Sequence, residues 1–164
     1  MARVLRADKL GTLVEKLKAA GYRVVALKRE GELVLFREIA SAGEIAGNVV
    51  NTDKSFKEYL FPCSEKILGY RMAKDKVELE EPGDAARKTV ILGCRPCDAA
   101  SLPIITEVFK WDYQDEFFLK RLEATTVVSA ACATCDSYCF CTSVGLAPNT
   151  KQGSDVLLTK TADG

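Results

Sequence analysis

The 164-residue sequence contains no histidine. That absence excludes a catalytic triad or proton shuttle built on histidine, and it excludes a zinc site with mixed cysteine and histidine ligands. A metal ion or cluster in this protein would therefore be held mainly by cysteine thiolates. Soft thiolate ligands select zinc or iron–sulfur clusters, so the cysteine pattern itself has to distinguish the two.

An excess of one charge and long apolar runs are absent as well. The 23 lysines and arginines balance 23 aspartates and glutamates, so no strong field attracts nucleic acid. No apolar run approaches the ~18 to 20 residues of a membrane span, and residues 1–8 lack the apolar region of a signal peptide. We therefore expect a cytoplasmic protein without nucleic-acid binding or membrane insertion. The length and the hydrophobic content of 48% predict one domain over residues 1–164.

Cysteine, by contrast, is abundant. The chain has seven cysteines, and four of them fall within ten residues. Thiols in the cytoplasm are normally kept reduced, so this number indicates metal ligation or redox chemistry and not a disulfide framework. The dense group consists of Cys132, Cys135, Cys139 and Cys141, and a separate pair consists of Cys94 and Cys97.

Both cysteine groups follow β-branched runs, residues 89–93 and 125–130, that are typical of buried strands. The carboxyl ends of parallel strands meet at one edge of a sheet, where ligand-binding groups collect. We therefore expect the two groups to converge on one small inorganic centre. The lone Cys63, which follows a proline, is instead expected to be a small buried core residue with a short helix after it.

The remaining patterns predict an α/β fold. Apolar residues at helical spacing indicate a helix from Leu10, capped by Asp8 and ended by Gly21, followed by an antiparallel hairpin over residues 22–37. Further helices are expected at residues 99–111 and 113–122, the second capped by Asp112 with Tyr113 toward the core, and a last strand at residues 155–159. The predicted fold class is a largely parallel sheet flanked by helices in two or three layers, with an N-terminal helix-hairpin extension and a cysteine-rich cluster loop.

Three kinds of site are compatible with the cysteines. Two C-x2-C pairs would satisfy a structural zinc site, and the chain offers them as Cys94 with Cys97 and Cys132 with Cys135. That assignment leaves Cys139 and Cys141 without a role as ligands. C-x2-C pairs also serve in metal-free thiol-disulfide relays. The surplus of thiols favours an iron–sulfur cluster, with the structural zinc site and the redox relay as alternatives.

Four segments carry a family resemblance, in order along the chain. Residues 61–66, residues 93–99, Cys132 with residues 139–145, and residues 155–159 resemble the N-terminal half of the sulfhydrogenase beta subunit family, which also includes an iron–sulfur subunit of anaerobic sulfite reductase. The most specific steps are Arg95-Pro96-Cys97-Asp98 and residues 139–143. The family's C-terminal ferredoxin-like region has no counterpart here, so we expect either a fragment or a short stand-alone member.

The resemblance implies an iron–sulfur electron-transfer subunit of an anaerobic oxidoreductase complex, without catalysis of its own. It would pass electrons between a flavin and NAD(P)H module and a hydrogenase or reductase partner. No G-x-G-x-x-G follows a strand, so the chain itself has no nucleotide-binding fingerprint. A 4Fe-4S cluster is favoured over a 2Fe-2S cluster. The implied four-thiolate ligand set is Cys97, Cys132, Cys139 and Cys141.

Several neighbours of these cysteines are candidate cofactor-binding residues. Arg95 either donates a hydrogen bond to cluster sulfur or pairs with Asp98 or another carboxylate. Asp98 is expected to cap the following helix, and the free backbone N-H groups at the start of that helix are expected to point toward the cluster. Thr142 and Ser143 either donate hydrogen bonds to the cluster or only turn the chain. The loop of residues 132–145 is expected at the surface, with its aromatic residues shielding the centre from water.

Overall fold

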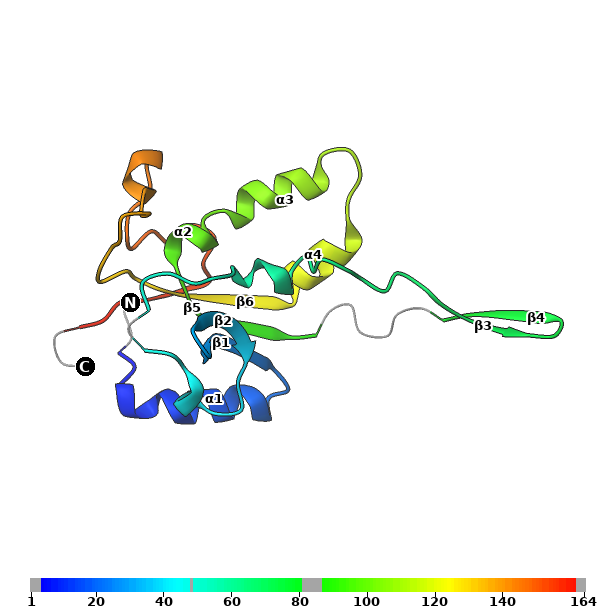
Figure 1. The fold of residues 1–164 in the computed structure, drawn as a ribbon, viewed down its shortest axis with the longest axis horizontal. Coiled ribbons are helices and arrows are strands. Elements are labelled where there is room, and N and C mark those ends of the chain that lie inside the picture. The colour runs from blue at the N-terminus through cyan, green and yellow to red at the C-terminus, as the bar shows by residue number, and fades with distance from the viewer. Residues whose placement is uncertain (1–3, 48, 81–86, 162–164) are drawn as a thin grey trace.

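The computed structural model describes residues 4–47, 49–80 and 87–161. Its centre is a five-stranded sheet in the order β2-β1-β5-β6-β7, in which every neighbouring pair is parallel except β1 and β2 (Figure 1). The predicted, largely parallel α/β sheet is confirmed, and the predicted hairpin forms its antiparallel edge. The strands are β1 (Arg23–Glu30), β2 (Leu33–Glu38), β3 (Gly69–Ala73), β4 (Lys76–Glu80), β5 (Thr89–Cys94), β6 (Thr125–Ala130) and β7 (Val156–Leu158).

Helices cover both faces of the sheet. In Figure 1, α1 lies on one face, and α2, α3 and α4 lie on the other. This arrangement produces three layers, because the alternating side chains of each strand supply a core on either side. The helices are α1 (Leu10–Ala19), α2 (Pro96–Ala99), α3 (Leu102–Lys110) and α4 (Glu116–Glu123), with short 3-10 turns η1 (Ala7–Lys9), η2 (Ala42–Glu44), η3 (Phe56–Tyr59) and η4 (Cys141–Val144).

The two cores differ in composition. Under α1, Val14 packs with Val24 and Leu92 in a small aliphatic cluster. Under α2 to α4 the core is larger and more aromatic, and the ring of Phe118 stacks on Phe109 at a centroid distance of 4.2 Å. Phe109 and Phe118 therefore belong to this core, and their packing fixes α3 and α4 on the sheet.

The predicted caps of two helices are wrong, and one of these helices also starts later than expected. The helix expected from residue 113 begins at Glu116, because the Asp115 carboxylate, and not Asp112, accepts a hydrogen bond from the backbone N-H of Phe118 at 2.9 Å. Tyr113, expected in the core, is consequently 80% exposed. Likewise Asp8 does not cap α1 but lies in η1, where its carboxylate pairs with Arg6 at 3.2 Å.

The prediction for Cys63 is also wrong. Cys63 is exposed, and the residues after it form no helix but run into an antiparallel pair of strands, β3 and β4. Figure 1 shows this pair as an arm that extends away from the sheet and its helices. The register places four exposed apolar side chains on one face of the arm, a feature that was not predicted from the sequence. They are Tyr70, Met72, Val77 and Leu79.

Within the described residues, no helix has the length and apolar character needed to cross a membrane.

Candidate metal centre

The two cysteine groups leave the sheet at neighbouring strand ends. Strands β5 and β6 run parallel, and a bulge between Leu92 and Cys94 ends their regular pairing. Gly93 sits in that bulge with φ of 83°, a left-handed conformation that favours glycine. The chain then turns into α2, whose first turn contains Cys97. After β6, the backbone N-H of Cys132 donates to the carbonyl of Pro148 at 3.0 Å, which fixes the start of the cysteine-rich loop.

Five thiols line a single cavity of about 540 Å³ at this edge of the sheet. The predicted convergence is therefore confirmed for Cys97 and the dense group but not for Cys94, and the role of these thiols as metal ligands stays a prediction. In the described parts of the chain, no three cysteine, aspartate or glutamate side chains are already placed to hold one metal ion. The five cysteines that line this thiol cavity are Cys97, Cys132, Cys135, Cys139 and Cys141.

Cys94 is separate from these five. Its side chain is 0% exposed, belongs to the core under α2 to α4, and lies with Sγ 3.2 Å from the hydroxyl oxygen of Ser129. Burial raises the pKa of the Cys94 thiol to about 12. A thiol that is neutral and enclosed in this way is a packing residue, not a ligand facing the cavity.

The thiols in the cavity interact electrostatically. Burial raises the pKa of the Cys132 thiol, and the nearby Cys97, Cys139 and Cys141 raise it further, while the positive charge of Arg95 opposes them. The protonated form is thus favoured when no metal is bound. Because metal ligation requires the thiolates, loading such a site should release protons and should weaken as the pH falls.

Asp136 organises the loop between the cysteines. Its carboxylate accepts hydrogen bonds from the backbone N-H of Tyr138 at 2.9 Å and from the Cys139 thiol at 3.3 Å. The first of these bonds is the main cause that lowers the pKa of Asp136. For Cys139, the backbone hydrogen bond from Asp136 favours the thiolate, but the Asp136 carboxylate opposes it, and the net effect raises the pKa of the thiol. Asp136 was not predicted from the sequence, although an aspartate whose side chain accepts a hydrogen bond from the N-H two residues further on is a familiar turn signal.

Of the other predicted site residues, Arg95 and Asp98 line the thiol cavity, whereas Thr142 and Ser143 do not. Arg95 lines the thiol cavity and forms no salt bridge with any described residue. Asp98 also lines it, but it lies inside α2 instead of capping it, and its carboxylate binds Lys57 Nζ at 2.8 Å and accepts a bond from the Ser55 hydroxyl at 2.7 Å. The Lys57–Asp98 pair thus ties η3 to α2 beside the cavity.

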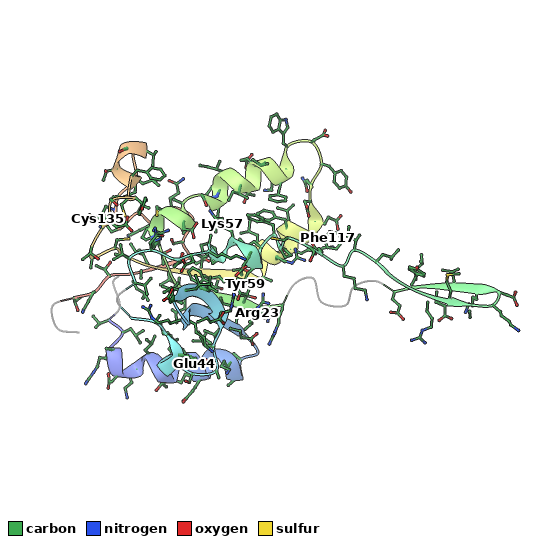
Figure 2. All side chains as sticks on the ribbon, viewed as in Figure 1. Arg23, Glu44, Lys57, Tyr59, Phe117 and Cys135 are labelled. Carbon is green, nitrogen blue, oxygen red and sulfur yellow. The ribbon has the colours of Figure 1, made fainter. Side chains whose placement is uncertain are left out.

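Thr142 and Ser143 are exposed on η4 and do not line the cavity. The predicted surface position of the loop is confirmed, and Figure 2 shows Cys135 at the end of the molecule opposite the arm. Tyr138 and Phe140 line the cavity but are 78% and 67% exposed, so their side chains form its outer rim instead of a closed shield.

Comparison with known proteins supports the resemblance found in the sequence. Sulfhydrogenase 2 subunit beta of Pyrococcus furiosus is 26% identical over 160 residues. The chain is a distant homologue of this subunit. The match covers 98% of the chain and 46% of the relative, so the chain spans about half the length of the protein it matches. No protein-family model matches the chain, and no solved structure matches it.

Proposed function

We propose that this chain is an iron–sulfur electron-transfer module of an oxidoreductase complex, with the cluster held in the thiol cavity. The observation that carries the proposal is the convergence of five thiols, from two distant parts of the chain, on one cavity at the surface. The distant relationship to a subunit of a sulfhydrogenase supports the same class of protein.

The donor set fits this cofactor. Cys97, Cys132, Cys139 and Cys141 would supply the four thiolates of a 4Fe-4S cluster, and Cys135 lines the same cavity as a fifth thiol able to replace one of them. When bound, the cluster would accept and donate single electrons. The guanidinium of Arg95 would offset part of the negative charge of four thiolates, an influence that raises the reduction potential of a cluster.

The surroundings fit electron exchange with a partner. The cavity lies at the surface, and Tyr138, Phe140 and Val144 present exposed apolar side chains at its rim. Exposed apolar groups of this kind mark surfaces that other proteins cover. The partners would be a flavoprotein that delivers electrons from NAD(P)H and a hydrogenase or reductase subunit that consumes them.

The test is anaerobic reconstitution of the purified chain with iron and sulfide, followed by visible absorption, electron paramagnetic resonance and metal analysis. We expect a brown, dithionite-reducible chromophore. Single substitution of Cys97, Cys132, Cys139 or Cys141 by serine should remove most of it, whereas Cys63→Ser and Cys94→Ser, whose thiols lie outside the cavity, should retain it.

Each alternative outcome has its own signature. Stoichiometric zinc without a chromophore would indicate a structural metal site, and a reversible disulfide without metal would indicate a thiol relay. A full chromophore in two of the four ligand variants would contradict the assigned ligand set. Cys135→Ser should lower the yield of the chromophore only when it is combined with the loss of one of the four primary ligands.

A further inference from the structure

A second cavity, also of about 540 Å³, lies at the opposite edge of the central sheet from the thiols. Its lining includes Arg23, Thr89 and Thr125, which are the first residues of β1, β5 and β6. The thiols follow the last residues of β5 and β6, so the length of these strands separates the two cavities. The second cavity therefore needs an explanation of its own.

Four guanidinium groups line this cavity, and they come from separate elements. They are carried by β1, by β2, by the residue two positions before β5, and by α4. We call the space that they line the arginine cavity. The four residues are Arg23, Arg37, Arg87 and Arg121.

Most of these side chains are held in fixed positions. Arg23 donates two hydrogen bonds to the hydroxyl oxygen of Thr89, at 3.2 and 3.0 Å, and its guanidinium lies 5.0 Å from the ring centroid of Tyr59. Figure 2 shows Arg23 and Tyr59 close together beside the sheet. Arg121 donates to the backbone carbonyl of Leu60 at 3.3 Å, and only 16% of its side chain is exposed. A binding site gains affinity when its donors are already ordered.

Arginines outnumber carboxylates among the described residues that line the cavity, and Glu30, Glu38 and Glu65, which pair with three of these arginines, are not among the lining residues. Arg37, Arg87 and Arg121 each pair with a glutamate, but Glu58, a partner of Arg37, is the one carboxylate among the described residues that line the cavity. The pKa of Arg121 is lowered, first by burial and then by the positive charge of Arg23, which shows that the two guanidiniums repel each other. An anion placed between them would relieve this repulsion.

We propose that the arginine cavity binds a phosphoryl group, either as free phosphate or as part of a phosphorylated small molecule. The planar fork of arginine donates two parallel hydrogen bonds to phosphate oxygens, and it keeps its charge in a partly buried site. The volume falls within the range of small-molecule sites and exceeds what one phosphate fills. The hydroxyl of Ser64 at the wall provides a further donor to oxygen atoms, whereas the hydroxyl of Thr89 already donates to the carbonyl of Arg87 at 2.8 Å.

Titration calorimetry with inorganic phosphate, pyrophosphate and ADP, in low-salt buffer, tests the proposal on the purified chain. We expect saturable binding of at least one of the three that weakens as chloride is added. Tighter binding of ADP than of pyrophosphate would identify a nucleotide as the ligand class, and equal or weaker binding of ADP would identify the free oxyanion. Absence of binding by all three would overturn the proposal.

Two variants locate the site. Arg23→Met and Arg121→Met should each weaken binding about tenfold or more, because each removes a charged donor. Arg29→Met is the matched control, since Arg29 is exposed on β1 and does not line the arginine cavity, and it should bind like the wild type. Equal weakening in the control would overturn the assignment.

Circular dichroism verifies that each variant is folded. Chemical-shift changes in the wild-type protein provide a readout without any substitution. They should centre on Thr89 and Tyr59 when phosphate is added, and changes confined to other residues would also refute the site. Neither measurement depends on iron, so failure here leaves the proposed cluster function untouched.

Discussion

In the metal-free, reduced protein, Cys94 should be alkylated much more slowly than the other cysteines. Iodoacetamide reacts with the thiolate, and burial raises the pKa of Cys94 to about 12. At about pH 8, roughly one Cys94 thiol in ten thousand would be ionised, against about one in four for a thiol with an ordinary pKa near 8.5. This difference alone predicts alkylation about two thousand times slower, and a side chain that is 0% exposed gives the reagent no access.

Mass spectrometry of timed, quenched and digested samples measures the rate at each cysteine. Cys63 is the internal reference, because its side chain is exposed and lies outside the thiol cavity. Labelling of Cys94 at a rate similar to that of Cys63, in protein that circular dichroism shows to be folded, would refute the reasoning. It would mean that Cys94 reaches solvent and becomes a candidate ligand again.

Two further predictions concern stability. Gly153→Ala should destabilise the protein by more than about 1 kcal/mol in urea unfolding. Gly153 has φ of 70°, and an added Cβ would overlap the carbonyl oxygen of Ala99. Unchanged stability would refute this packing. The hydrogen bond from Lys28, followed by backbone hydrogen bonds, lowers the pKa of Glu44 from 4.5 to about 2. The ionised carboxylate therefore contributes to the stability of the fold above about pH 4.5, and this contribution is lost as the pH falls toward 2. Glu44→Gln should therefore lower the melting temperature at neutral pH, and the difference from wild type should shrink over that interval; a constant difference would contradict the assignment.

Local patterns predicted β5 and β6 well because these two strands are rich in β-branched residues. The runs at β5 and β6 stand out in the sequence, and the rule that parallel strands end at one edge was enough to bring Cys97 and Cys132 to one cavity. Helix starts were less accurate, since Asp112 and Asp115 are equivalent caps in sequence and only the packing of Phe118 selects the second.

The arm and the arginine cavity could not be predicted in the same way. In β3 and β4, apolar Tyr70 and Leu79 alternate with charged residues, but Lys74-Asp75 is not one of the glycine-containing pairs that mark a tight hairpin. The arginine cavity has no local signal at all. Arg23 and Arg121 lie far apart in sequence, and only the pairing of the strands brings them together.

The arm has a consequence for how unfolding of this protein is observed. A two-stranded hairpin without a packed face is marginally stable in water, and all residues of β4 are exposed. The arm can therefore open as a separate cooperative unit while the sheet stays intact, so its amide hydrogens exchange with solvent far faster than those of buried Ile91. A melting curve consequently reports the loss of the sheet, whereas substitutions in the arm register in residue-level hydrogen exchange.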